Sequence, residues 1–285
     1  MAVIMSGKDV AERISGAAAS EVAEARKNGT VPTLAIIRIG SSPGDIAYEN
    51  SAMRRASQIG VAVRNLIFDA DITQEELIDE IKKVNEDRSI HGALLLRPLP
   101  AHMDDRKVCD SLAPEKDMDG ITSGSLAGVF MDRHRGYPPC TAAACMELLE
   151  HYGIDLSGKK MTIIGRSLVI GKPVSMMALK QDATVTICHS RTSAEDFRTA
   201  CSRADIVLSA IGRARMIGAD KLGKDQIIID VGISVDEKGE LCGDVDFDEA
   251  VKSASMITPV RDGIGSITSS ILMRHVADAA LEQTA

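Results

Sequence analysis

The stretch MTIIGRSLVIGKP, from Met161 to Pro173, decides the fold class. An apolar run ends at Gly165, and a second glycine, Gly171, follows six residues later. This order predicts a buried strand, a tight turn and the start of a helix. The unpaired backbone N–H groups and the dipole at such a helix N-terminus attract anions. The stretch therefore predicts a phosphate-binding turn, with an ordinary strand-to-helix turn as the alternative.

The residues around this turn favour NADP over NAD. Ser167 stands where the dinucleotide fingerprint G-x-G-x-x-G has its middle glycine, and Arg166 precedes it. In NAD-preferring folds an acidic residue ends the next strand and binds the ribose 2′-hydroxyl. Here that strand, at residues 183–189, is followed by Ser190 and Arg191. The planar donors of arginine suit a 2′-phosphate, although a solvated basic surface remains the alternative.

Apolar segments and helical patterns alternate outward from this turn. The second half has four such strands, at residues 159–165, 183–189, 204–210 and 226–232. Their spacing predicts a Rossmann-type, doubly wound parallel sheet. The first half has predicted strands at 33–40, 61–68 and 92–96, and helices at 44–60 and 76–87. This regular alternation predicts an α/β fold with parallel strands covered by helices.

Three further segments complete the predicted organisation. Thr73 and Glu76 form a capping box at the start of the helix at 76–87. Residues 113–140 show little periodicity and many turn residues, which predicts a long, partly ordered connection. We expect a helix at 141–153 to bridge two domains, and a last helix at 264–283 to return to the first domain.

Composition excludes several classes of protein. The 285 residues carry 33 basic and 41 acidic side chains, a net charge of −8, which argues against a general nucleic-acid or membrane-surface binder. The six cysteines form no C-x-x-C pair and none has histidine at metal-ligand spacing, so we expect reduced thiols and no metal. The beginning of the chain has no signal-peptide pattern, and no stretch is long and apolar enough to span a membrane. We expect a cytoplasmic protein.

Several motifs occur in an order and spacing typical of one enzyme family. They are KDMDG, PPCT, GRSLVIGKP, CHSRT, IIIDVGI, GDVDF and the late segment ITPVRDGIGSIT. With them the chain resembles, over nearly its whole length, the bifunctional methylenetetrahydrofolate dehydrogenase/cyclohydrolases of the FolD type. The resemblance implies two αβ domains flanking a cleft that holds the active site, and a homodimer. Residues 1–140, completed by a helix at 264–285, would bind folate, and residues 141–263 would form the NAD(P)-binding Rossmann domain.

The resemblance also implies roles for individual residues. Tyr48 would lie against the folate ring system, and Asp119 would accept hydrogen bonds from the pterin N–H groups. Pro259 and Gly263 are retained members of the family's late loop. The residues implied to bind NADP are Gly165, Arg166, Ser167, Gly171, Ser190, Arg191, Ile211, Gly212, Gly232, Ile233 and Thr268. Among these, the segment Ile211–Arg213 and the pair Gly232 and Ile233 would line the nicotinamide end. From residue type alone, a core tyrosine and a turn aspartate remain the alternatives at positions 48 and 119.

The chain departs from the family pattern at two positions that serve hydrolysis. The family usually has lysine four residues after the tyrosine, where this chain has Ala52, and glutamine where it has Leu96. In the late loop, Arg261 and Asp262 replace Pro-Gly. Hydride removal needs alignment and water exclusion, whereas hydrolysis of the methenyl cation needs a positioned ionisable group. The sequence therefore predicts a dehydrogenase with weak or absent cyclohydrolase activity.

Three alternatives stay open at this point. The first retains both activities through a rearranged site, in which Asp262 is the candidate substitute catalyst, while Arg55 or Arg261 steadies a folate carboxylate. The second is a regulatory protein that binds folate or nucleotide without turnover. The third is an NADP-linked dehydrogenase of another substrate.

Overall fold

The computed structural model describes residues 2–236 and 238–283, and the chain divides into two compact units. Unit 1 consists of the segment that ends at Ala11 together with Thr141–Thr268. Unit 2 consists of Glu12–Cys140 and the segment that begins at Ser269. Both are α/β, which confirms the predicted fold class. In the described part of the chain, no helix combines the length and apolar character that a membrane crossing requires.

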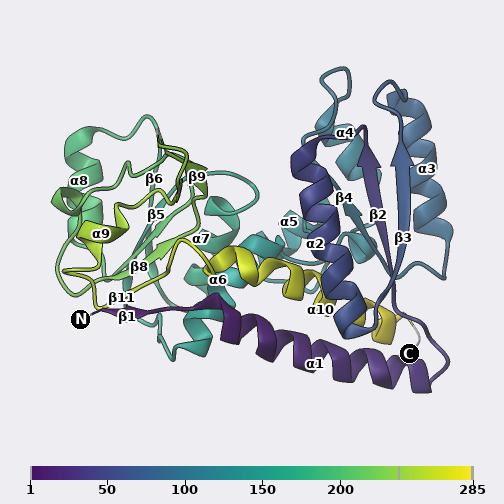
Figure 1. Ribbon diagram of the computed structural model, residues 1–285, viewed down its shortest axis with the longest axis horizontal. Coiled ribbons are helices and arrows are strands. Elements are labelled where there is room, and N and C mark those ends of the chain that lie inside the picture. Colours follow the sequence, from purple (N-terminus) through teal and green to yellow (C-terminus); the bar gives the residue numbers. More distant parts are fainter. Residues whose placement is uncertain (1, 237, 284–285) are drawn as a thin grey trace. The chain divides into compact units, whose positions relative to one another are not determined.

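Unit 1 is built on a six-stranded sheet in the order β1-β11-β8-β7-β5-β6, in which every pair is parallel (Figure 1). The strands are β1 Val3–Ile4, β5 Lys160–Ile164, β6 Thr184–Cys188, β7 Ile206–Ser209, β8 Ile227–Asp230 and β11 Met256–Ile257. The order reverses at β5, whose neighbours are β6 and β7. In open parallel sheets, ligands bind beyond the carboxyl ends of the strands at such a reversal.

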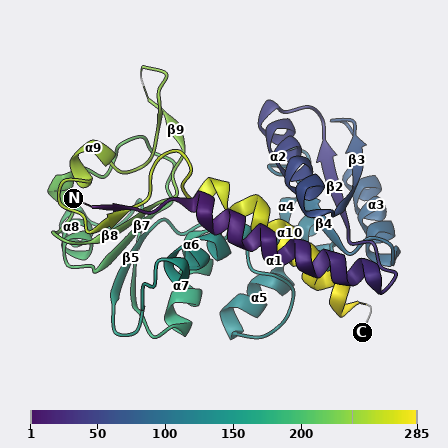
Figure 2. The ribbon, with the colours of Figure 1, turned by 60° about the horizontal axis from the view of Figure 1, so that its bottom comes forward.

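Helices cover both faces of this sheet (Figure 2). They are α6 Cys140–His151, α7 Gly171–Lys180, α8 Ala194–Ser202 and α9 Phe247–Ala250. Cys201 of α8 and Ala250 of α9 pack with Val207 and Ile228 in one core cluster. Val174 and Ala178 are the buried apolar side chains of α7. Because apolar residues meet helices on both faces, the central strands are nearly continuous apolar runs. A short antiparallel pair, β9 Ser234–Val235 and β10 Leu241–Cys242, lies outside the large sheet.

The edge of the large sheet differs from the predicted organisation. The sequence patterns predict neither β1 nor β11, and the predicted boundary assigns residues 1–140 to one domain. In the structure Val3 pairs with Met256 and Ile4 with Ile257, so the first segment groups with unit 1. Two-residue strands carry no measurable periodicity, and only their pairing partners identify them.

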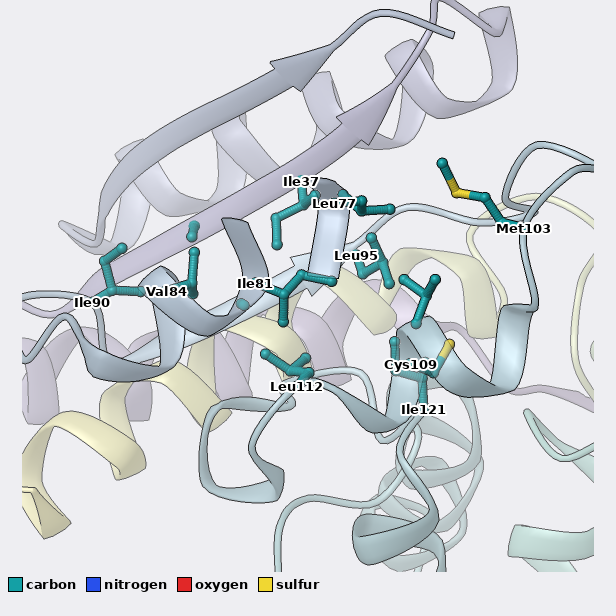
Figure 3. Packing of buried hydrophobic residues seen from close by; sticks show 13 residues of the cluster. Ile37, Leu77, Ile81, Val84, Ile90, Leu95, Met103, Cys109, Leu112 and Ile121 are labelled. Carbon is teal, nitrogen blue, oxygen red and sulfur yellow. The ribbon is translucent and has the colours of Figure 1, made fainter. Parts of the chain in front are cut away.

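Unit 2 contains a three-stranded parallel sheet in the order β3-β2-β4. Its strands are β2 Thr33–Ile39, β3 Ala62–Phe68 and β4 Gly92–Leu95, and its helices are α1 Gly7–Lys27 (from Glu12 on), α2 Pro43–Ile59, α3 Gln74–Glu86, α4 Asp105–Asp110, α5 Ser123–Met131 and α10 Thr268–Glu282 (from Ser269 on). The α3 side of the sheet is closed by a core that includes Ile37, Leu77, Ile81 and Leu95 (Figure 3). On α2, the buried residues include Ala52 and Ala56.

Two helix termini of unit 2 test the predictions directly. The capping box of α3 is confirmed, because Thr73 Oγ1 accepts the Glu76 N–H and Glu76 Oε2 accepts the Thr73 N–H. The connection predicted at 113–140 instead contains α5, whose N-cap Thr122 accepts the Ser125 N–H. The buried carboxylate of Asp117 accepts the N–H groups of Ile121 and Thr122. These short-range hydrogen bonds fix the start of a helix that has little periodicity of its own.

Candidate functional site

The glycine turn of unit 1 lies between β5 and α7. Gly165 has φ 124°, and a Cβ there would lie 2.7 Å from the carbonyl oxygen of Ala210. A Cβ on Gly171 would lie 2.2 Å from the carbonyl oxygen of Gly165. Any side chain at either position would therefore force the turn apart. The two glycines allow the turn to close directly onto the first residues of α7.

Ser167 supports this turn although it replaces a glycine of the fingerprint. Its hydroxyl accepts the Ile170 N–H at 3.1 Å, and its carbonyl accepts the Lys172 N–H at 3.1 Å. Arg166 and Ser167 are both exposed. The side chains of the turn are thus available to a ligand while its backbone is held by local hydrogen bonds.

A cavity of about 950 Å³ opens at this turn, inside unit 1. It is lined by five of the residues predicted to bind the cofactor, namely Gly165, Arg166, Ser167, Ser190 and Ile211. The sheet brings them together because β5, β6 and β7 are neighbours and their carboxyl ends meet at one edge. A volume of this size is typical of a cofactor-sized ligand site.

Arg191 is not among the residues that line this cavity. Its side chain is exposed, and its backbone N–H donates to His189 Nδ1 at 3.1 Å. The backbone turn at His189 is closed by Thr192, whose Oγ1 accepts the His189 N–H at 2.9 Å. Of the two residues predicted after β6 for the 2′-phosphate, the structure therefore places Ser190 alone on the cavity wall.

Three charged residues on the cavity wall, Glu195, Arg198 and Lys221, lie outside the predicted cofactor set, whereas Arg213 belongs to the segment predicted at 211–213. Arg198 and Glu195 come from α8, Arg213 follows β7, and Lys221 comes from the short 3₁₀ helix at Ala219–Lys221. Arg198 and Lys221 both approach Asp220, at 3.7 and 3.4 Å. Apart from Arg213, which follows the SA-I-G segment after β7, no sequence pattern indicates them, because α8 reads as an ordinary amphipathic helix.

Two carboxylates organise the loops that follow β7 and β8. The buried side chain of Asp244 accepts the N–H groups of Ile211 at 2.8 Å and Arg213 at 2.7 Å, and the hydroxyl of Ser209 at 2.8 Å. Gly212, which lies between the two N–H donors Ile211 and Arg213, has φ 64°. The GDVDF motif, which sequence reasoning used only to recognise the family, thus holds a loop predicted to line the nicotinamide site.

Asp230, at the end of β8, holds the second loop. It accepts the N–H groups of Gly232 at 3.0 Å, Asp244 at 3.1 Å and Val245 at 2.8 Å. Burial raises the pKa of Asp230 to about 6 even though these N–H groups lower it. A Cβ on Gly232 would lie 2.2 Å from the Asp244 carboxyl, so glycine is required there. Ile233, the next residue, is exposed.

The late loop of unit 1 carries the last predicted positions. Thr258 Oγ1 accepts the Asp230 N–H at 2.8 Å, which ties the start of this loop to β8. A Cβ on Gly263 would lie 2.5 Å from the carbonyl oxygen of Pro259, so these two predicted residues pack together. Thr268 Oγ1 donates to the Gly265 carbonyl at 3.2 Å. Asp262 is exposed, and its carbonyl accepts the Gly7 N–H at 2.6 Å.

In unit 2, the predicted folate residues Tyr48 and Asp119 lie within electrostatic range of each other and of Cys140. Burial raises the pKa of Asp119 to about 6, and the neighbouring carboxylate of Asp117 raises it further, while hydrogen bonds from the Cys140 thiol and N–H oppose the shift. Burial and then the Asp119 charge raise the Tyr48 pKa well above its usual value. Tyr48 therefore stays a neutral hydrogen-bond donor beside a carboxylate that titrates near pH 6.

Ala52 and Leu96 are both buried in unit 2. Ala52 lies on α2 one turn after Tyr48, and Leu96 directly follows β4, where its N–H donates to the Ile37 carbonyl at 2.9 Å. Arg55, which the sequence offered as a possible substitute, approaches the hydroxyl groups of Ser15 and Ser269 at 3.3 and 3.5 Å. Two buried apolar side chains thus stand at the positions where the family pattern has polar ones.

Known proteins match this chain along almost its whole length. The catalytic domain of the tetrahydrofolate dehydrogenase/cyclohydrolases matches residues 5–119, and the NAD(P)-binding domain of the same family matches residues 139–284. A protein of Clostridioides difficile, named bifunctional protein FolD, is 45% identical over 276 residues, which cover 97% of this chain and 96% of that protein.

Two solved structures agree with this assignment. The bifunctional FolD methylenetetrahydrofolate dehydrogenase/cyclohydrolase of Campylobacter jejuni has a TM-score of 0.96 at 32% identity and covers 99% of both chains. The FolD of Trypanosoma brucei, which was solved with NADP cofactor and an inhibitor, has a TM-score of 0.91 at 32% identity and covers 99% of this chain and 98% of its own. This chain therefore belongs to the tetrahydrofolate dehydrogenase/cyclohydrolase family, the FolD family.

Proposed function

We propose that the chain is an NADP-dependent dehydrogenase that oxidises 5,10-methylenetetrahydrofolate to 5,10-methenyltetrahydrofolate. The observation that carries this proposal is that Arg166, Ser190 and the glycine turn line one and the same cavity. Arginine and a hydroxyl suit a 2′-phosphate, whereas an NAD site of this fold has a carboxylate at the end of the second strand. The NADP-bound relative from Trypanosoma brucei supports the same choice.

The proposed dehydrogenase step makes modest demands on the protein. When bound, NADP⁺ would supply the hydride acceptor for the one-carbon bridge, and the cation left on the substrate would be delocalised over two of its nitrogens. Asp119 holds the pterin through its N–H groups, and neutral Tyr48 lies against the ring system. The loops tied down by Asp244 and Asp230 line the nicotinamide end. Alignment and exclusion of water then supply the rate enhancement, without an enzymatic acid or base.

We propose further that the cyclohydrolase step is slow in this chain. Water must attack the methenyl cation and a proton must reach the leaving nitrogen, for which a positioned ionisable group contributes about 10²–10⁴-fold. Ala52 transfers no proton and Leu96 orients no water. Both side chains are buried, and neither carries a group that can ionise.

The second candidate function retains both activities, and the names of the relatives favour it. The Clostridioides difficile protein at 45% identity is named bifunctional, as is the Campylobacter jejuni enzyme. Under this alternative another group serves hydrolysis, and exposed Asp262 of the late loop is the candidate. A folate-binding protein without turnover is a third candidate, motivated by the same two apolar positions.

One coupled assay separates these candidates. Purified protein is mixed with methylenetetrahydrofolate and NADP⁺, and NADPH and methenyl product are followed separately. Methenyl product that accumulates in step with NADPH supports the slow-cyclohydrolase proposal. Loss of methenyl product faster than its spontaneous hydrolysis supports the bifunctional alternative. Absence of reduced cofactor with either NADP⁺ or NAD⁺ contradicts the proposed dehydrogenase activity.

We also propose a homodimer, which light scattering of the purified protein tests directly.

A further inference from the structure

A buried ion pair joins β2 to α2 in unit 2. Arg38 Nε lies 2.6 Å from Glu49 Oε2, and the side chains are only 11% and 6% exposed. Arg38 also donates through Nη1 to the carbonyl oxygen of Gly40, in the loop that leads from the strand to the helix. This pair is more enclosed than those of Arg64 with Asp87, Arg97 with Asp105 and Arg215 with Asp236. The sequence offers Arg55, Arg261 and Asp262 as charged substitutes but gives no sign of this pair.

The pair lies on the same sheet face as the two apolar substitutions. Ile37 of β2 is in register with Leu95 of β4, so the following residues, Arg38 and Leu96, are neighbours whose side chains share a face. Glu49 and Ala52 are three residues apart on α2, hence on one side of the helix, and both are buried. Positions 38, 49, 52 and 96 therefore form one neighbourhood, which we name the β2–α2 cluster.

Tyr48 depends on the same helix turn. It directly precedes Glu49, and its hydroxyl group is the one that Asp119 and Cys140 perturb. The ion pair with Arg38 fixes where this turn of α2 lies over the carboxyl end of β2, because the guanidinium binds both the helix and the connecting loop. A small displacement of this turn would move Tyr48 away from the folate ring system.

We propose that Arg38 and Glu49 are positioning residues for the folate site, and that their pair occupies the neighbourhood in which the family usually has a lysine at position 52. The proposal rests on the proposed dehydrogenase function. The pair places two enclosed charges, which balance each other, near a site where hydride removal creates a cation on the substrate. A lysine at position 52 would bring a third charge into this neighbourhood, and burial disfavours a charge that the balanced pair leaves without a partner. The four positions of the β2–α2 cluster are thus coupled.

The first test compares Arg38→Met, Glu49→Gln and the double variant, with Arg38→Lys as the conservative change. Each single variant leaves a buried charge unpaired and should lower kcat/KM for methylenetetrahydrofolate roughly 10- to 100-fold, with KM for NADP⁺ unchanged. The neutral double variant should fold and lose less than either single variant, and Arg38→Lys should restore part of the loss. The control is Arg64→Met, which breaks the half-exposed pair of Arg64 with Asp87 (2.7 Å) elsewhere in unit 2 and should leave kinetics unchanged.

The second test measures the coupling. Ala52→Lys with Leu96→Gln is made in the native chain and in the Arg38→Met, Glu49→Gln background, and methenyl hydrolysis is measured above its spontaneous rate. We expect at least about a tenfold larger gain in the second background. Equal gains in both, or single variants that lower Tm while KM and kcat for folate stay native, would overturn the proposal. An inactive native chain would instead refute the proposed function, because the effect of each variant is measured relative to the activity of the native enzyme.

Discussion

Asp230 and Asp244 are directly joined, because Oδ1 of Asp230 accepts the backbone N–H of Asp244 at 3.1 Å. This hydrogen bond connects the end of β8 to the GDVDF segment. The Asp244 side chain in turn binds the backbone N–H groups of the loop at Ile211–Arg213. Two carboxylates thus hold two loops that the family resemblance assigns to the nicotinamide end. Neither side chain needs to touch a ligand for this role.

Replacing Asp244 with Asn should weaken cofactor binding. An amide presents one acceptor oxygen where the carboxylate accepts three hydrogen bonds, so the Ile211–Arg213 loop loses at least one partner. We expect KM for NADP⁺ to rise about tenfold and Tm to fall, since one lost bond to a buried charged group costs about 1.5–3 kcal/mol. Asp248→Asn is the control, because Asp248 is exposed and its pair with Arg215 lies at the surface. Native kinetics in Asp244→Asn would contradict the positioning role.

The pKa of Asp230 predicts a pH dependence of stability. Burial raises this pKa from 3.8 to about 6, so between these values the folded chain holds a proton that the unfolded chain has lost. The free energy of unfolding contributed by Asp230 therefore falls as pH rises from about 4 to about 6, and stays low above that. Urea unfolding at pH 4, 5, 6 and 7 should show a smaller decline in Asp230→Asn than in the native chain. An identical slope in both proteins would exclude Asp230 as its source.

Asp119 predicts a pH dependence of folate binding. Burial raises its pKa to about 6, and only the ionised carboxylate accepts all the pterin N–H groups that we assign to it. KM for methylenetetrahydrofolate should therefore rise as pH falls below about 6, while KM for NADP⁺ stays constant. Asp119→Ala should raise the folate KM roughly 10- to 100-fold and abolish this pH dependence, since hydrogen bonds to charged groups are worth about 1.5–3 kcal/mol. A pH profile that survives in Asp119→Ala would assign the titration to another group.

Arg166 should discriminate between the two nicotinamide cofactors. Arg166→Ala removes a cation from the cavity wall and should weaken NADP⁺ binding about 10- to 100-fold with a small effect on NAD⁺, because only NADP⁺ carries the 2′-phosphate. Arg191→Ala is the matched control, since Arg191 adjoins Ser190 but does not line the cavity, and its effect should be several-fold smaller. Equal losses for both cofactors in Arg166→Ala would remove the 2′-phosphate assignment.

Short-range patterns determined most of the architecture. Apolar runs such as that of β5 are long enough to indicate a buried strand. The glycines at 165 and 171 are required by the backbone of one turn. The capping box of α3 is complete within four residues. These features involve neighbours along the chain, so their residues predict them without any knowledge of the fold. The family motifs added the assignment of the two domains.

Contacts between distant segments were decided only by the tertiary structure. Val3 becomes a strand residue because Met256 lies beside it. The sequence predicted Arg191 and not Arg198 as a cofactor-binding residue, yet of the two only Arg198 lines the cavity. The pair of Arg38 with Glu49 likewise appears only when α2 packs on β2. A sequence pattern reports on residues that are a few positions apart along the chain. These groups are far apart along the chain and come into contact only through sheet register and helix packing.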